Sequence, residues 1–234
     1  MRTTDASAYR EGMLIVEELH LLLLRPDGRV ESSVSTNRMF GEIAAVIVDL
    51  VLHRRVMVGE GKNPTITIVS SEPTGHPVLD AALAALAPVN GKRLQSLVMR
   101  SKLDPLDEVV ESLVAQGVLA RGERGFFGWG AERTPESDPG PEALLRSRLA
   151  AVIAGSLAPT QADLALVAIL QGMNAAHPLL RDELPPISAG QLKRRIEQLT
   201  EGSLTGDAVS RAVTMVISAA MMAAMAPVFV ATMS

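Results

Sequence analysis

A dense apolar run near the start of the chain constrains the fold more than any other feature. Between residues 14 and 24, only two glutamates and one histidine interrupt the apolar side chains. A helix that is apolar on nearly every side is typically buried within a larger helical body. Residues 25–28, Arg-Pro-Asp-Gly, then end the helix with typical turn chemistry. The rest of the chain must therefore supply the helices that surround this one.

Composition sets the broad class of protein. The chain has 234 residues, which is long enough to bury a substantial core. Its formal charge of −4 excludes a global basic field, so nucleic acid is not an expected partner. The absence of cysteine excludes disulfides, thiolate nucleophiles and cysteine metal sites, and it fits a cytoplasmic protein.

The length of the chain allows one large domain or two small ones. Residues 1–12 are polar, lack the apolar core of a secretory signal, and are expected to form a disordered lead-in. Residues 131–142 are rich in proline, glycine and acids and form the best candidate for a linker or loop.

Helical periodicity and capping signals dominate the remaining sequence, while two short segments look like β-hairpins. The expected hairpins pair residues 56–58 with 65–69, and residues 118–121 with 126–129 around a turn at 122–125. The predicted fold class is therefore mainly α, with buried central helices and one or two small hairpins. Helices are expected over residues 35–53, 78–86, 92–100, 104–116, 143–154, 160–173, 188–199 and from about 207 onward.

The last predicted helix needs its own interpretation, because no residue from Ala212 to Ser234 is charged. An uncharged stretch of this length would be long enough to span a membrane. However, alanine, methionine, serine and threonine dominate it, and Pro227 interrupts it. These residues are only weakly hydrophobic, so a buried core helix is favoured over a membrane span.

No catalytic or metal-binding motif is evident. The four histidines are scattered, and none has a histidine partner three or four residues away. His20 is expected to be a satisfied core residue. The adjacent acids Glu17 and Glu18 are explained by the favourable helix dipole at a helix start. We therefore expect no catalytic residue, no metal site and no cofactor.

Half of the six aromatic residues, Phe126, Phe127 and Trp129, lie in one short segment. Two interpretations stay open: the rings cover the end of the preceding helix, or they form an exposed apolar tip that meets a membrane or a partner. A helix followed by a hairpin is also typical of winged-helix DNA-binding units. That helix carries only acids and no base, so DNA binding is rejected.

Several segments together resemble the Golgi phosphoprotein 3 family. Their order and spacing hold over about residues 13–130, and the aromatic segment at 126–129 follows in the expected place. The segments are Val16-Glu17-Glu18-Leu19 with Leu22-Leu23-Leu24, Val48-Asp49-Leu50-Val51-Leu52-His53-Arg54-Arg55-Val56, Pro73-Thr74-Gly75 with Leu79-Asp80-Ala81-Ala82-Leu83, and Leu113-Val114-Ala115-Gln116-Gly117-Val118-Leu119.

This resemblance implies that residues 13–234 form a single, mostly helical domain with a loop at 131–142 and a projecting hairpin. It also implies a peripheral membrane adaptor rather than an enzyme. Eukaryotic members bind phosphatidylinositol 4-phosphate on the cytosolic face of the Golgi and hold glycosyltransferase tails there. The expected partner is an anionic phospholipid or membrane surface, and the expected localisation is cytoplasmic and peripherally membrane-associated. Protein clients and a homo-oligomer stay open.

The residues that bind the lipid headgroup in the family are replaced at the corresponding positions of this chain. The family's tryptophan and three arginines correspond to apolar residues that cannot bind a phosphate, at about Val34, Ile43, Leu103 and Leu106. Nearby bases are the substitute candidates for the headgroup, namely Arg38, Arg55, Arg100 and Lys102.

The aromatic segment matches the family better. Phe126, Phe127 and Trp129 fall where the family has its membrane-dipping apolar residues, so the hairpin tip, rather than a basic patch, is expected to carry membrane affinity. The alternatives are a cytosolic protein-interaction scaffold without a lipid ligand and, as a third class, an unrecognised hydrolase or transferase.

Overall fold

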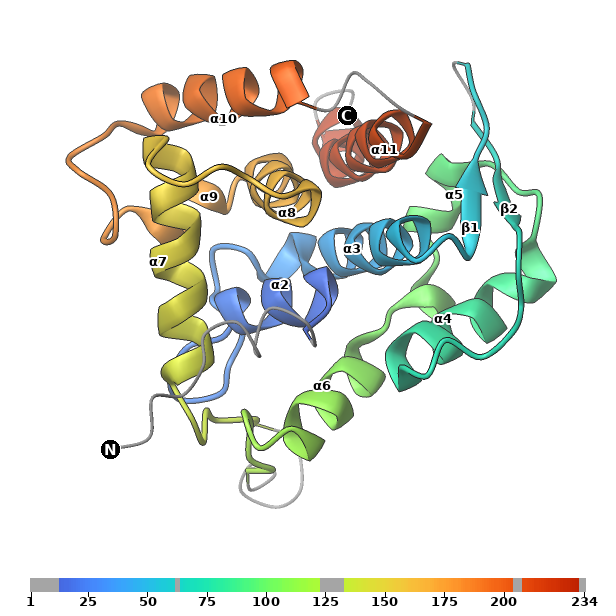
Figure 1. Ribbon diagram of the computed structural model, residues 1–234, viewed down its shortest axis with the longest axis horizontal. Coiled ribbons are helices and arrows are strands. Elements are labelled where there is room, and N and C mark those ends of the chain that lie inside the picture. The colour runs from blue at the N-terminus through green and yellow to red at the C-terminus, as the bar shows by residue number, and fades with distance from the viewer. Residues whose placement is uncertain (1–12, 62–63, 123–132, 204–207, 232–234) are drawn as a thin grey trace.

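A computed structural model describes residues 13–61, 64–122, 133–203 and 208–231 (Figure 1). Side-chain surroundings in the last helix are described as far as Met222. The predicted lead-in at 1–12 and the aromatic segment at 126–129 lie outside the described residues.

The described part of the chain is mainly helical, which confirms the predicted fold class. One two-stranded antiparallel hairpin, β1 Val56–Val58 with β2 Ile66–Ile68, places Met57 opposite Thr67. Short 3₁₀ turns are η1 Ser35–Asn37, η2 Ala87–Val89 and η3 Ser101–Leu103. The α-helices are α2 Ile15–Leu23, α3 Arg38–Leu52, α4 Pro77–Leu86, α5 Leu94–Val98, α6 Leu106–Ala115, α7 Gly140–Ala154, α8 Gln161–Gly172, α9 Ala176–Leu180, α10 Ala189–Ser203 and α11 Ala208–Ala231.

Helix α2 forms the centre of the domain, as its apolar sequence predicts. All nine of its residues are buried. It packs against α3, α6, α7 and α8, and these helices surround it in Figure 1. The glutamates and the histidine within it are therefore also enclosed, which requires polar partners from other helices.

Helix α11 covers the other side of α3 and also packs on α5 and α8. Its inward residues Ala212, Val213, Val216 and Ile217 are all buried in the common core. The interpretation of this segment as a core helix is therefore confirmed. Within the described ranges, no helix combines the length and apolar character that crossing a bilayer requires.

For the second hairpin, the structure gives residues 118–122 a partner that the sequence did not predict. Leu119 forms an antiparallel bridge with Glu136, and the Gly122 N–H donates to the Arg133 carbonyl at 2.8 Å. Residues 118–122 thus pair with 133–136, while the predicted partner, residues 126–129, lies outside the described part of the chain. A proline cannot donate to a ladder, but the Pro135 carbonyl accepts the Ala120 N–H at 2.9 Å. The described part of the Pro-rich segment 131–142 is therefore fixed to residues 120–122 by backbone hydrogen bonds and is not a free loop.

Most predicted helix starts are confirmed, and the differences are local. The capping boxes Thr160–Asp163 and Ser188–Gln191 both form, with reciprocal side-chain to backbone hydrogen bonds. The α6 helix begins at Leu106, with Pro105 rather than Asp104 at the cap position. Asp104 Oδ1 still accepts the Leu106 N–H at 3.3 Å, and the same carboxylate pairs with Arg38 in the first turn of α3.

Gly28 is a point where two distant segments touch through the backbone. Its φ is +75°, and a Cβ atom at this position would lie 2.4 Å from the Pro135 nitrogen. Gly91 has a similar φ of +78°, but nothing lies within 4 Å of its ideal Cβ. A side chain at either glycine would strain the backbone, but only a side chain at Gly28 would also collide with a neighbouring segment. Substitutions at the two positions therefore distinguish the two costs.

We predict that Gly28→Ala destabilises the protein more than Gly91→Ala does. Both variants introduce an L side chain in the left-handed region, which costs about 1–2 kcal/mol. Only Gly28→Ala also forces the chain away from Pro135, adding about 1–3 kcal/mol. Urea unfolding of the two variants measures the difference, and equal losses would contradict the tight packing of the 25–28 turn on residue 135.

We also predict that a chain lacking residues 208–234 is insoluble or unfolded. Without α11, the apolar faces of α3, α5 and α8 lose their cover. Expression in the soluble fraction and thermal unfolding are the measurements. A truncated chain that stays soluble with unchanged thermal stability would show that α11 is not part of the core.

Candidate functional site

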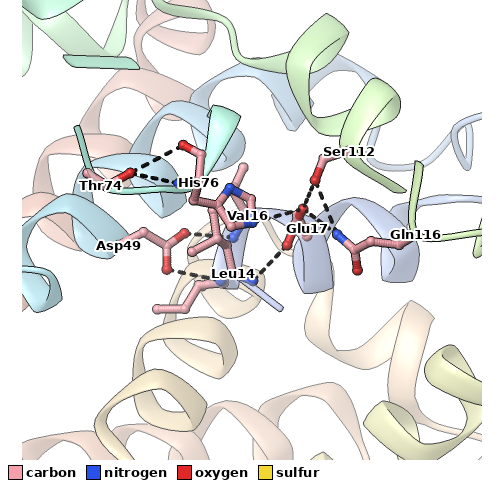
Figure 2. Close-up of polar contacts among 9 residues, drawn as sticks. Leu14, Val16, Glu17, Asp49, Thr74, His76, Ser112 and Gln116 are labelled. Carbon is pink, nitrogen blue, oxygen red and sulfur yellow. Dashed lines mark hydrogen bonds and ion pairs between the residues drawn. The ribbon is translucent and has the colours of Figure 1, made fainter. Parts of the chain in front are cut away.

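The buried start of α2 is the most polar place in the described core. Free N–H groups at a helix start need acceptors, and Leu14 at the cap position offers no side-chain acceptor. Asp49 of α3 supplies them instead: its two carboxylate oxygens accept the N–H groups of Ile15 and Val16, each at 3.0 Å (Figure 2). The Leu14 N–H donates to Glu17 Oε2 at 2.8 Å.

Glu17 then joins α2 to α6. Its Oε1 accepts a hydrogen bond from Ser112 Oγ at 2.6 Å and from Gln116 Nε2 at 3.0 Å (Figure 2). The imidazole of His76 is close to the same oxygen: its Nε2 lies 3.6 Å from Glu17 Oε1. A fully buried carboxylate is thus surrounded by donors from three segments.

The loop before α4 positions His76. The Thr74 Oγ1 donates to Asp80 Oδ1 at 2.7 Å and accepts the His76 N–H at 3.1 Å. The Thr74 N–H donates to the same Asp80 oxygen at 2.6 Å, and these bonds lower the pKa of the Asp80 carboxyl. Residues 74–80 therefore form a closed turn that holds the histidine ring toward α2.

The four segments that carry the family resemblance meet in this cluster. Each contributes one polar group: Glu17, Asp49, Thr74 and Gln116 (Figure 2). We call these four residues with His76 and Ser112 the α2 hub. The sequence suggested that the helix dipole explains Glu17. The dipole alone does not explain this glutamate, because the partners of Glu17 come from α6 and from the loop before α4.

Two ion pairs that share Arg148 flank the hub on the α7 and α8 side. Arg148 of α7 bonds Glu18 Oε2 at 2.7 Å and pairs with Asp163 of α8 at 2.9 Å. A cavity of about 250 Å³ opens beside these groups and Asp49. Each of the three carboxylates that line it is already engaged by protein donors, so none is free for a ligand.

Burial dominates the electrostatics of the hub. It raises the pKa of Asp49 to about 8, against the opposing effect of the two N–H groups that the carboxylate accepts. Burial also raises the pKa of Glu18, although Arg148 opposes it. In the described part of the chain, no cluster of three histidine, aspartate or glutamate side chains is placed to bind a metal.

The positions that correspond to the family's phosphate-binding residues face inward. Val34, Ile43 and Leu103 are buried, and Leu106 is half-buried. The side chains of Val34, Ile43 and Leu103 belong to the hydrophobic core. A headgroup site at these positions would need the core to open.

Arg38, the first substitute candidate, is occupied by protein carboxylates. Its guanidinium bonds Asp104 through two nitrogens, at 2.9 and 2.6 Å, and also bonds Glu42. Glu42 in turn bonds His20 Nδ1 at 2.8 Å. His20 is therefore in the core, as expected, but its Nε2 has no hydrogen-bond partner among the described residues. A phosphate at Arg38 would have to displace a bidentate carboxylate.

Arg55 lies at the far end of α3, about 20 Å from Arg38 by the rise of the helix. Its guanidinium donates to Ser70 Oγ at 3.1 Å and to the Pro73 carbonyl at 3.2 Å. It therefore helps to fix the loop before α4. The structure does not bring Arg55 together with the other candidates.

Arg100 and Lys102 are exposed, and the structure groups them with two bases that the sequence-based candidates did not include. Four bases flank the short helix α5, and we call them the basic strip: Lys92, Arg93, Arg100 and Lys102. None of them forms an ion pair with a described carboxylate. Residues 91–103 contain these four bases and no acid, which is the sequence signal that identifies the strip.

Helix α5 makes the strip face outward. Leu94, Leu97 and Val98 are buried under it, so the flanking cations stay in solvent. Met99, in the middle of the strip, is an exposed large apolar residue with 50% of its surface accessible.

The fold and site define a mainly helical domain with an internally paired polar hub and a local basic surface. The model of the Golgi phosphoprotein 3 (GPP34) family matches residues 15–216. The chain belongs to this family. A comparison with the curated proteins gave no significant match.

We predict that Asp49 makes the protein less stable as pH rises from about 4 to about 8. In this window the unfolded carboxyl, with a pKa near 4, has lost its proton, while the folded carboxyl with a pKa of about 8 keeps it. Relative to Asp49→Asn, the wild-type unfolding free energy should fall by up to about 1.4 kcal/mol per pH unit.

Urea unfolding of both proteins from pH 5 to pH 8 measures this change. Glu72→Gln, at an exposed acid, is the control and should keep a constant offset from wild type. A difference between wild type and Asp49→Asn that stays constant, or grows in favour of wild type, would contradict a protonated Asp49.

Proposed function

We propose that this chain is a non-catalytic peripheral membrane adaptor that binds anionic lipid headgroups. Membership of the Golgi phosphoprotein 3 family supports the class. Phosphatidylinositol 4-phosphate is the headgroup suggested by the resemblance to the eukaryotic members. The observation that carries the proposal is the basic strip, because it concentrates four exposed cations in a chain whose net charge is −4.

The strip has the charge that an anionic bilayer requires. A lysine or arginine close to such a surface contributes about 1 kcal/mol, so four of them support reversible binding. Because these cations are exposed, salt screens the attraction. Arg100 and Lys102 stay as headgroup candidates, while Arg38 and Arg55 serve internal contacts.

The aromatic segment supplies the second contact in this proposal. Phe126, Phe127 and Trp129 bury apolar area at about 25 cal/mol per Å² on entering the bilayer, and this contribution depends little on salt. Stable anchoring generally takes two signals, and an apolar contact together with a cationic strip would provide them. The two contributions are therefore separable by ionic strength.

Vesicle co-sedimentation tests the proposal, using phosphatidylcholine with and without phosphatidylinositol 4-phosphate. We predict that changing all four residues of the basic strip to glutamine weakens binding to the anionic vesicles at least tenfold at low salt. The matched control changes four other exposed cations to glutamine: Arg25, Arg29, Lys193 and Arg194. It has the same net charge and should bind nearly as wild type does.

Changing Phe126, Phe127 and Trp129 to serine should weaken binding at every salt concentration, and the remaining binding should then be salt-sensitive. Circular dichroism checks that each variant keeps its helices. Equal binding by the strip variant and its control would overturn the role of the strip. A wild-type chain that binds no vesicle would overturn the membrane function and favour a protein-interaction scaffold.

A further inference from the structure

A groove of about 150 Å³ lies beside the basic strip, where α11 meets α5 and the turn between β1 and β2. These elements gather at one corner of the molecule in Figure 1. The α11 helix forms one wall, and Gly61 and Pro64 border the groove from the hairpin side. The α11 wall consists of Thr214, Met215, Ser218, Ala219 and Met222.

The α11 wall is more apolar than its sequence suggests. The Thr214 hydroxyl donates to the Ser210 carbonyl at 3.0 Å, and the Ser218 hydroxyl donates to the Thr214 carbonyl at 2.8 Å. Both hydroxyls are therefore turned back onto the helix, and they leave carbon atoms toward the groove. Met222, with 51% of its surface exposed, adds a flexible thioether to this wall.

The polar groups of the groove come from the α5 side. Arg93 and Gln95 line it, both are exposed, and neither side chain has a hydrogen-bond partner among the described residues. Arg93 is the single ionisable residue among the groove's described lining residues. The groove therefore complements a molecule that joins an anionic group to a narrow apolar chain.

We propose that the groove holds a segment of one acyl chain of an anionic lipid, with the headgroup at Arg93 and this segment along Met215 and Met222. This inference rests on the proposed membrane function and adds a specific seat for a single lipid. Charge complementarity and the continuity of Arg93 with the basic strip select a lipid as the occupant. An apolar space of about 150 Å³ admits a group of the size of benzene, which suits a single chain segment.

Dodecyl phosphate, kept below its micelle concentration, is the probe. Methyl NMR of the methionines should show saturable shifts at Met215 and Met222. Inorganic phosphate should leave these signals unchanged, and uncharged dodecyl maltoside should bind at least tenfold more weakly. Arg93→Gln should weaken binding of dodecyl phosphate about tenfold, as expected for loss of a charged hydrogen bond.

Filling the groove gives the sharpest variant. Ser218 is exposed on α11, so Ser218→Phe should block the groove without disturbing the core, whereas Ser147→Phe makes the same change on the exposed face of α7. We predict that Ser218→Phe abolishes the methionine shifts and that Ser147→Phe leaves them intact. Shifts that persist in Ser218→Phe, or that inorganic phosphate alone produces, would overturn the inference.

The vesicle assay separates this inference from the function on which it rests. If wild-type protein binds anionic vesicles but dodecyl phosphate causes no methionine shift, the groove inference fails alone. If wild type binds no vesicle, the membrane function fails. Competition for the groove by an acidic peptide of greater affinity than dodecyl phosphate would also overturn the lipid assignment.

Discussion

The structure depends on one constraint: the N-terminal end of an almost wholly apolar helix is buried. Amide groups at such an end cannot reach water, and leaving each unpaired costs about 1–3 kcal/mol. The cap residue, Leu14, has no side-chain acceptor to offer them. Asp49 from the neighbouring helix and Glu17 from the first turn supply the acceptors. Helices α2 and α3 are thereby fixed in relative position as well as in packing.

Once carboxylates are placed there, they need donors of their own, and this need organises the surrounding elements. Ser112 and Gln116 bring α6 to the hub, and His76 brings the loop before α4. On the other side, Arg148 joins α7 to α8 across Glu18. The family signature thus describes how the domain is assembled around α2. The surface that we assign to lipid, by contrast, contains none of the hub residues, so the two can vary independently within one fold.

Much of this architecture could be predicted from local sequence patterns. Periodicity and capping residues give most helices to within a few residues, and two capping boxes form as expected. Contacts between distant segments could not be predicted. The strand pairing of residue 122 with 133 was missed because prolines suggest a loop, although their carbonyls still accept hydrogen bonds. The bidentate partner of Arg38, Asp104, lies 66 residues away and could not be predicted, although Glu42, its other partner, lies one helical turn away in the sequence. The basic strip was only half recognised, since the candidates were sought near the family's own positions rather than by the absence of acids.

The packing of α11 against α3 has a consequence for the timing of folding during synthesis. The two helices are separated by about 160 residues, and the intervening chain does not cover the face of α3 that α11 occupies. At translation rates of about 5–20 residues per second, this face stays open for roughly 10 to 30 s. A nascent chain with an uncovered apolar helix is a typical substrate for molecular chaperones. The apolar face of α3 is therefore covered only after α11 has left the ribosome.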